Sequence, residues 1–230
     1  IAIGMLMLIR NDSYEQHHHN LQTNPFKELA DSWSYLLQRP LLVYIYALNT
    51  TLFVSFMVSP IVLAPFIKTA LHGTGRDFTT TEVIFSIGMI MGGLIIPWIA
   101  DRWGHVRCLF LTVIYTSMLF IIISINHSIS LLMMWYFFLG IGLPIWSVIA
   151  SLAQQHTPKD MQGRLQSLSQ TLSSCGLMLV YLLLSLYGSH IPLAHCYWLC
   201  AALGVVNLVF ICQIYRHAHN TPQSGTISTT

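Results

Sequence analysis

Residues 92–107 read GGLIIPWIADRWGHVR, and they decide the fold because a short charged turn within them joins two long apolar segments. Each of these segments is long enough to cross a bilayer as a helix, which takes about 20 residues. Asp101, Arg102 and Arg107 stand out in a chain of 230 residues that has only 10 Lys and Arg and 8 Asp and Glu residues. The turn therefore marks the place where two membrane spans meet at one face of the membrane.

Composition places the whole chain in the membrane class. Hydrophobic residues make up 54% of the sequence and charged residues 8%, against about 25% charged residues in soluble domains. The formal net charge of +2 is too small to indicate nucleic-acid binding, and no basic helix or zinc-finger spacing supports it. We therefore expect the partners to be the lipid bilayer and a small-molecule substrate, with no nucleic acid and no cofactor.

The first 39 residues are predicted to contain the end of one span and a linker. Residues 1–9 are apolar but too short to cross a bilayer, and they lack the charged start and cleavage site of a signal peptide. They are typical of the end of a preceding span, which predicts that the chain is a fragment. Residues 10–39 are predicted to be a linker that ends in an amphipathic helix, with an apolar face of Phe26, Leu29, Ala30, Trp33, Leu36 and Leu37. We interpret the run His17-His18-His19 as solvated linker rather than as a metal sensor.

Residues 40–214 are predicted to form a bundle of six transmembrane helices, so the predicted fold class is all-α. Pro60 and Pro65 should kink or end the first span, and Pro97 and Pro144 should act similarly in the second and fourth. The expected spans, each near the length that a tilted helix needs, are Leu41 to Phe66, Thr80 to Ala100, Val106 to Ile125, Ser128 to Ala153, Leu165 to Tyr187 and Pro192 to Ile214.

Loop charges predict the orientation of the bundle. Of the 10 Lys and Arg residues, only Lys68 and Arg76 lie in a loop on one face, and the others lie in the linker, the turns on the opposite face and residues 215–230. Because cytoplasmic loops carry an excess of Lys and Arg, we expect the linker, both basic turns and the C-terminal tail to be cytoplasmic. The expected location is a bacterial inner membrane.

Polar side chains within the spans are almost all uncharged. No Asp, Glu, Lys or Arg is expected in the hydrocarbon part of any span, so a carboxylate that carries protons should lie elsewhere in the complete protein. The third and sixth spans are strongly apolar and are expected to face lipid. The first and fifth spans are the most polar, and the polar face of the fifth either lines a cavity or packs against another helix. Its residues are Gln166, Gln170 and Ser173 on one face and Ser167, Thr171 and Ser174 on the neighbouring one.

Other classes of function find less support in the sequence. Cys196 and Cys200 share a helix face at the spacing i, i+4, but no further ligand has the spacing of a metal site. An intramembrane enzyme is not expected, because the histidines outside the linker and tail have no carboxylate partners. A membrane scaffold or sensor that transports nothing stays open, since a fold does not fix a function.

The charged turn resembles the loop motif of the major facilitator superfamily, in which a glycine-rich helix end leads into Asp-Arg-x-Gly-Arg-Arg at a cytoplasmic turn. In that superfamily the motif follows span two and recurs after span eight. Here it follows the second of six expected spans, so the chain resembles the C-terminal half of a twelve-helix transporter. The missing N-terminal half would then be a further partner.

A second turn points to a branch of the superfamily. Residues 155–164 read QHTPKDMQGR, which is similar to the Pro-x-x-x-x-Gly-Arg turn of drug and siderophore exporters. The linker helix that runs into Arg39-Pro40-Leu41 resembles the approach to span seven in the drug:proton antiporter branch that includes the enterobactin exporter. This resemblance implies export driven by proton entry, while import of a metabolite is the alternative. Pro97, His105 and Val106 depart from the family pattern.

The resemblance also implies roles for individual residues during alternating access. A gating latch would place Asp101 beside the N-terminus of the span that starts near Gly163, where free backbone N–H groups and the helix dipole favour an anion. The alternative is a charged turn that only sets topology. The latch residues would be Gly93, Asp101, Arg102, Gly104, Arg107, Pro158, Gly163 and Arg164, and the substrate cavity would hold Asn49, Phe53, Trp146, Gln170 and Ser174.

Overall fold

The computed structural model of the protein describes residues 25–188 and 192–220. The predicted span end at residues 1–9 and the run His17-His18-His19 lie outside this part of the chain, as do the last ten residues of the predicted tail.

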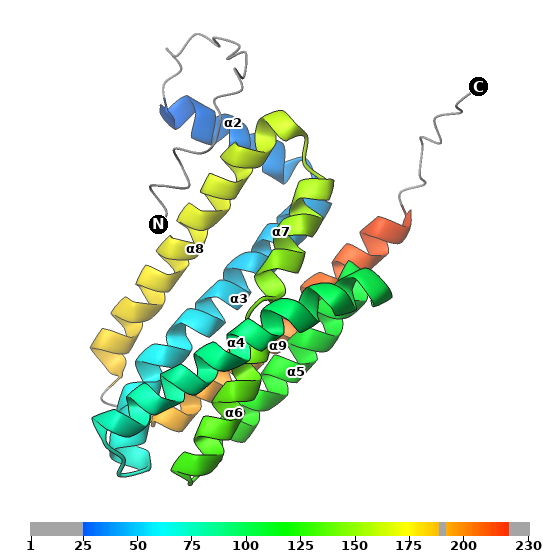
Figure 1. The fold of residues 1–230 in the computed structure, drawn as a ribbon. Helices are drawn as coiled ribbons and strands as arrows, with labels where there is room; N and C mark the ends of the chain where they lie inside the picture. Colours follow the sequence, from blue (N-terminus) through cyan, green and yellow to red (C-terminus); the bar gives the residue numbers. More distant parts are fainter. Residues whose placement is uncertain (1–24, 189–191, 221–230) are drawn as a thin grey trace, which may run out of the picture.

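The described chain begins with a short helix that lies across one end of the bundle. This helix, α2 (Pro25–Leu37), packs against α8 (Lys159–Tyr187), beside the turn that leads into α8 (Figure 1). Ser32 and Leu36 are buried, whereas Trp33 and Leu37 are exposed. The predicted apolar face is therefore divided, because Leu36 packs on the bundle while Trp33 and Leu37 remain free to meet the membrane surface.

The remaining helices form six membrane spans. They are α3 (Pro40–Pro65), which continues into the π-helical segment η1 (Phe66–Ala70), then α4 (Gly75–Trp103), α5 (His105–Ser124), α6 (Ile129–Gly142) with α7 (Ile145–Gln155), α8, and α9 (Leu193–Asn220). Within the described residues, six helices or helix pairs are long and apolar enough to cross a membrane. The prediction of an all-α membrane protein with six spans is confirmed.

Several predicted helix ends are wrong by one or two turns. Pro60 and Pro97 lie inside continuous helices, while Pro144 divides the fourth span into α6 and α7 because a proline nitrogen cannot donate a helical hydrogen bond. The helix α8 starts at Lys159 rather than at Leu165, and α9 continues beyond Ile214 to Asn220. Apolar patterning marks where a helix enters lipid, and a helix that continues into the polar interface leaves no such mark.

Packing of α4 against α6 brings two backbones into close contact. A side-chain carbon at Gly88 or Gly92 of α4 would meet the backbone oxygen of Phe137 or Ile141. Gly140 of α6 has the same relation to Phe85. Small residues permit this approach in membranes, where van der Waals contact drives helix association. Glycines therefore set the α4–α6 distance.

Buried hydroxyl groups link α3, α6 and α9 through hydrogen bonds. The hydroxyl groups of Ser59 on α3 and Tyr136 on α6 lie 2.9 Å apart, and those of Tyr136 and Tyr197 on α9 lie 2.7 Å apart. Tyr136 and Tyr197 are fully buried, so each hydroxyl needs a partner inside the protein. These bonds fix the relative rotation of α3, α6 and α9.

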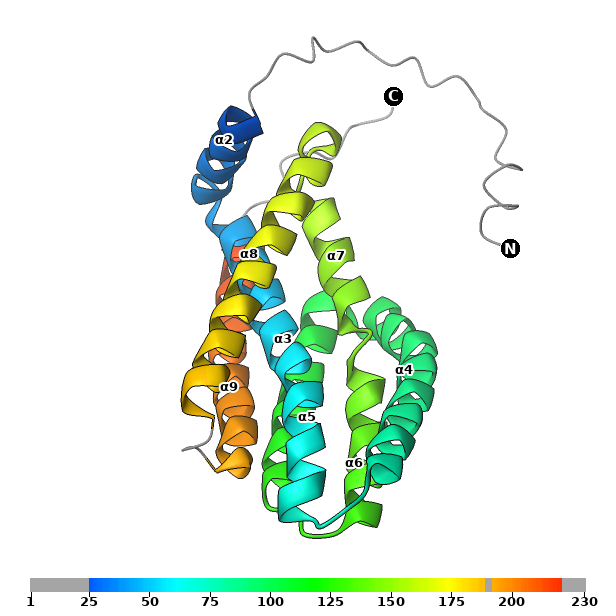
Figure 2. The same ribbon diagram turned by 90° about the vertical axis from the view of Figure 1, so that its left-hand side faces the viewer.

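Two spans are covered far less than the others. In the most apolar 18-residue stretch of each span, only 22% of the residues are buried in α4 and 17% in α8, against 44% in α5 and 39% in α9. Figure 2 shows α4 and α8 on opposite flanks of α3. The largest uncovered helix faces thus belong to α4 and α8, whereas α5 and α9 pack extensively on each other.

Candidate functional site

A cavity of about 250 Å³ lies between α3, α7 and α8. Each helix contributes one part of its wall, and the turn at Pro144 sets the start of α7 so that this helix faces α3 and α8. The lining residues are Tyr46, Asn49 and Phe53 from α3, Trp146, Ile149, Ala150 and Ala153 from α7, and Gln166 and Gln170 from α8.

Aromatic rings form the apolar wall of the cavity. The ring of Trp146 lies 5.7 Å from that of Phe53 and 5.8 Å from that of Phe56, measured between centroids. The indole Nε1 of Trp146 is buried and has no hydrogen-bond partner among the residues that the structure describes. A buried donor without a partner costs about 1 to 3 kcal/mol, so this N–H is an unsatisfied polar group beside the aromatic wall.

Amide side chains form the polar wall of the cavity, whereas the buried hydroxyl groups of α8 pack against α3. Asn49 Nδ2 donates to Ser169 Oγ at 3.2 Å, and Ser173 Oγ donates to Thr50 Oγ1 at 3.1 Å. These serines are buried and pack α8 against α3. Gln166 and Gln170 are exposed and line the cavity. The polar face of α8 therefore does both things that the sequence allows: its glutamines line a cavity, and its buried serines pack against α3.

Four of the five residues predicted for the substrate cavity lie around this one cavity, namely Asn49, Phe53, Trp146 and Gln170. Ser174 is exposed and is absent from the lining. Gln166 also lines the cavity; the sequence places it with Gln170 on the polar face of the fifth span but does not assign it to the substrate cavity. Tyr46 and the aliphatic residues of α7 carry no sequence signal that separates a cavity wall from ordinary packing.

A smaller cavity of about 200 Å³ adjoins the first toward the α7–α8 turn, and the two share Tyr46, Ala153 and Gln166. Gln162 holds this turn, because its Nε2 donates to the carbonyl oxygens of Gln154 and Thr157 at 3.1 and 3.0 Å. Gly163 lines the smaller cavity from inside α8. It therefore lies within the helix, rather than in the turn where the sequence places it.

The charged turn itself has one backbone feature that only glycine tolerates. Gly104 separates α4 from α5 at φ +88° and ψ 148°, a region essentially closed to residues with a side chain. The guanidinium of Arg102 lies 5.7 Å from the centre of the Trp98 ring. A side-chain carbon at Gly93 would meet open space, so Gly92, rather than Gly93, is the glycine needed for packing.

The predicted contact of Asp101 with the start of α8 is not formed in this conformation. Asp101 is exposed, and no hydrogen bond or ion pair joins it to any residue that the structure describes. Figure 1 shows the C-terminal end of α4 well apart from the N-terminus of α8. Pro158 precedes α8, and no side chain caps that helix, so its first N–H groups remain open to an acceptor.

One charged side chain lies deeper in a span than the sequence predicts. Because α4 starts at Gly75, Glu82 lies two turns inside this helix and is half-buried. Asp77 is occupied in the capping box at the start of α4, where its Oδ2 accepts from the backbone N–H of Thr74 at 2.7 Å and from the Thr74 hydroxyl at 2.8 Å. Of the two carboxylates in the first turns of α4, Glu82 is therefore the one without such a structural task.

Within the described residues, no group of three or more His, Cys, Asp or Glu side chains is placed to hold a metal ion. Cys196 and Cys200 are both buried, and Cys200 Sγ contacts the backbone oxygen of Ser55 at 3.7 Å. The two thiols serve helix packing.

Comparison with known proteins agrees with the helical architecture. A search of curated proteins gave no match. The family model described as Major Facilitator Superfamily matches residues 45–228, which include all six spans except the first turns of α3. With the six membrane helices, this match shows that the protein is an integral membrane protein and that the chain belongs to the major facilitator superfamily of transporters.

Proposed function

We propose that this chain is the C-terminal half of a twelve-helix transporter that exports a small organic molecule. The uncovered faces of α4 and α8 support this proposal, because they are the surfaces on which a second six-helix unit would pack. On α8 that face carries the exposed amide groups of Gln166 and Gln170, which lipid cannot satisfy. The exposed hydroxyl groups of Ser167 and Thr171 instead donate to backbone oxygens of α8 itself.

The substrate is proposed to be aromatic and to carry hydrogen-bond acceptors, as drugs and siderophores do. The cavity between α3, α7 and α8 carries the proposal, since the rings of Phe53 and Trp146 give it an aromatic wall. Asn49, Gln166 and Gln170 offer amide groups on the other side. No charged residue lines this cavity, so recognition would depend on stacking and neutral hydrogen bonds.

Transport would proceed by alternating access of the two halves around this cavity. The end of the bundle that carries α2 is proposed to be cytoplasmic, which agrees with the excess of Lys and Arg there. In one access state Asp101 would accept hydrogen bonds from the uncapped N-terminus of α8, and in the other it would be released. The exposed position of Asp101 in the structure is compatible with the released arrangement.

Proton entry is proposed to drive export, and Glu82 is the candidate carboxylate within this chain. An ionisable side chain inside a membrane span is costly to keep and usually has a function. Asp77 holds a helix cap, and Asp101 and Asp160 are exposed near helix ends, so they are less suited to sense a proton gradient. Further carboxylates are expected in the other half.

The experiment uses the full-length protein in everted membrane vesicles with a pH-sensitive dye. Addition of an aromatic siderophore or drug should dissipate the proton gradient, and Glu82→Gln should reduce this dissipation. Trp146→Ala should also reduce it, while Trp198→Ala on the exposed face of α9 serves as the control. Uptake of the compound by right-side-out vesicles would instead identify an importer. Absence of any flux would support a scaffold or sensor and would contradict the proposal.

A further inference from the structure

A second groove lies outside the transport cavity, on the outer surface between α5 and α9. Its volume is about 430 Å³, which falls in the range of about 300 to 1,000 Å³ for ligand pockets. It lies near the first turn of α5 and the last turns of α9. Its walls are Val106, Arg107, Phe110, Leu111, Ile211, Cys212, Tyr215 and Arg216.

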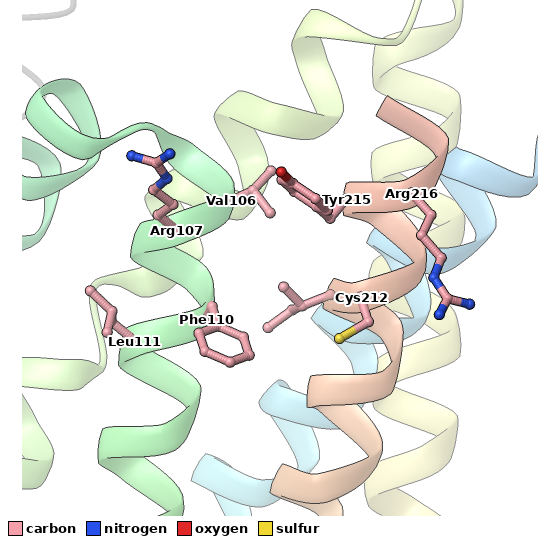
Figure 3. A pocket seen from close by; sticks show the side chains of 8 residues that line it. Val106, Arg107, Phe110, Leu111, Cys212, Tyr215 and Arg216 are labelled. Atoms are coloured by element: carbon pink, nitrogen blue, oxygen red, sulfur yellow. The ribbon is translucent and has the colours of Figure 1, made fainter. Parts of the chain in front are cut away.

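The inner part of this groove is apolar and open toward the membrane. Phe110 and Leu111 line the groove and are 40% and 46% exposed, and Figure 3 shows the Phe110 ring directed toward Cys212 across it. Because α5 and α9 both cross the membrane, the exposed surface between them meets hydrocarbon chains. An acyl chain can therefore lie along this wall without removing any polar group from water.

The mouth of the groove is cationic. Arg107 and Arg216 are both exposed, and neither forms a hydrogen bond or ion pair with the residues that the structure describes. Figure 3 shows their guanidinium groups on the opposite outer sides of α5 and α9, directed away from each other, and the Tyr215 ring directed across the mouth toward Val106. Arginine and tyrosine at the end of a span are suited to the lipid headgroup region.

Charge distinguishes this groove from another apolar groove on the same bundle. A groove of about 490 Å³ between α3, α8 and α9 is lined by aliphatic residues, Ser55 and two cysteines, with no Lys or Arg among them. Both grooves offer a surface for an acyl chain, but only the α5–α9 groove adds two cations at its mouth. The occupant that complements both features is a lipid with a negatively charged headgroup.

We propose that the α5–α9 groove binds one anionic phospholipid. To hold its phosphate, the exposed side chains of Arg107 and Arg216 turn toward the mouth from the two sides of the groove, and one acyl chain lies along Phe110, Leu111 and Cys212. This site is independent of the direction and substrate of transport, because it needs only that α5 and α9 cross the membrane.

Native mass spectrometry of the full-length protein tests this site. Phosphatidylglycerol and phosphatidylcholine with identical acyl chains are added in turn to protein in a neutral detergent. We expect one phosphatidylglycerol to bind more tightly than phosphatidylcholine. Arg107→Gln and Arg216→Gln should each weaken that binding roughly fivefold, the effect of one cation near a lipid surface. Arg76→Gln at the opposite end of the bundle is the control and should change nothing.

A variant that blocks the groove distinguishes specific lipid binding within the groove from non-specific attraction to a charged surface. Cys212→Trp fills the groove and keeps both arginines, so it should abolish the tight phosphatidylglycerol adduct. Retention of this adduct by Cys212→Trp would overturn the proposal. Equal binding of the two lipids by the unmodified protein would also overturn it, and that comparison does not depend on the folding of any variant.

Discussion

At the scale of single residues, Gly104 shows how one backbone angle ends a long helix. Its φ of +88° lets the chain leave α4 and start α5 within one residue. We predict that Gly104→Ala destabilises the full-length protein by about 1 to 3 kcal/mol, the usual cost of this backbone region for other residues. Gly93→Ala is the control, because its site is helical and open, and alanine should stabilise it by up to about 1 kcal/mol. Thermal unfolding in detergent measures both, and shifts in the same direction would contradict this account.

Single residues also show how far the sequence predicts the site. Asn49, Phe53, Trp146 and Gln170 could be predicted because the resemblance to the family places the first, fourth and fifth spans around the cavity, and they do line one cavity. Ser174 belongs to the same polar run but does not line it, since a short side chain one turn further along α8 does not reach the wall. Hydroxyl groups on a membrane helix can bond to their own backbone or to a neighbour, so their type alone does not reveal their direction.

At the scale of helices, the α4–α6 pair depends on glycines in contact with backbone. We predict that Gly92→Val prevents this packing, because its side chain would meet the backbone oxygen of Ile141. Overpacking of this kind typically costs about 1 to 3 kcal/mol. Gly93→Val places the same side chain on the adjacent open face. Size-exclusion chromatography of fluorescent fusions should show a lower yield of monodisperse protein for Gly92→Val, and an equal yield for the two variants would contradict the packing role.

Helix number and order could be predicted from the sequence, but helix ends could not. The spans follow from apolar length, and the break at Pro144 follows from its missing N–H. The sequence offers no comparable signal for the start of α8 at Lys159 or for the end of α9 at Asn220, because both lie in the interface where polar residues are tolerated in a helix. Because α8 and α4 both start earlier than the sequence predicts, Gly163 lies inside α8 and Glu82 lies two turns inside α4.

At the scale of the whole molecule, the latch should control exchange between access states. We predict that Asp101→Asn in the full-length protein slows transport and leaves membrane insertion intact. Loss of the charge removes about 0.3 to 2 kcal/mol of attraction to a helix N-terminus, and about 1.4 kcal/mol changes a two-state equilibrium tenfold. Asp31→Asn, at an exposed position of α2, is the matched control. Unchanged flux of Asp101→Asn at normal expression would show that the charged turn only sets topology.

The central proposal is that substrate passes through the cavity between α3, α7 and α8, and a cavity-filling variant tests it most directly. Gln170→Trp fills the cavity, while Ser147→Trp places the same side chain on an exposed position of α7. Substrate flux through everted vesicles is measured for both full-length variants at matched membrane expression. We predict that Gln170→Trp abolishes flux and that Ser147→Trp retains it, whereas full flux through Gln170→Trp would contradict the proposed transport route.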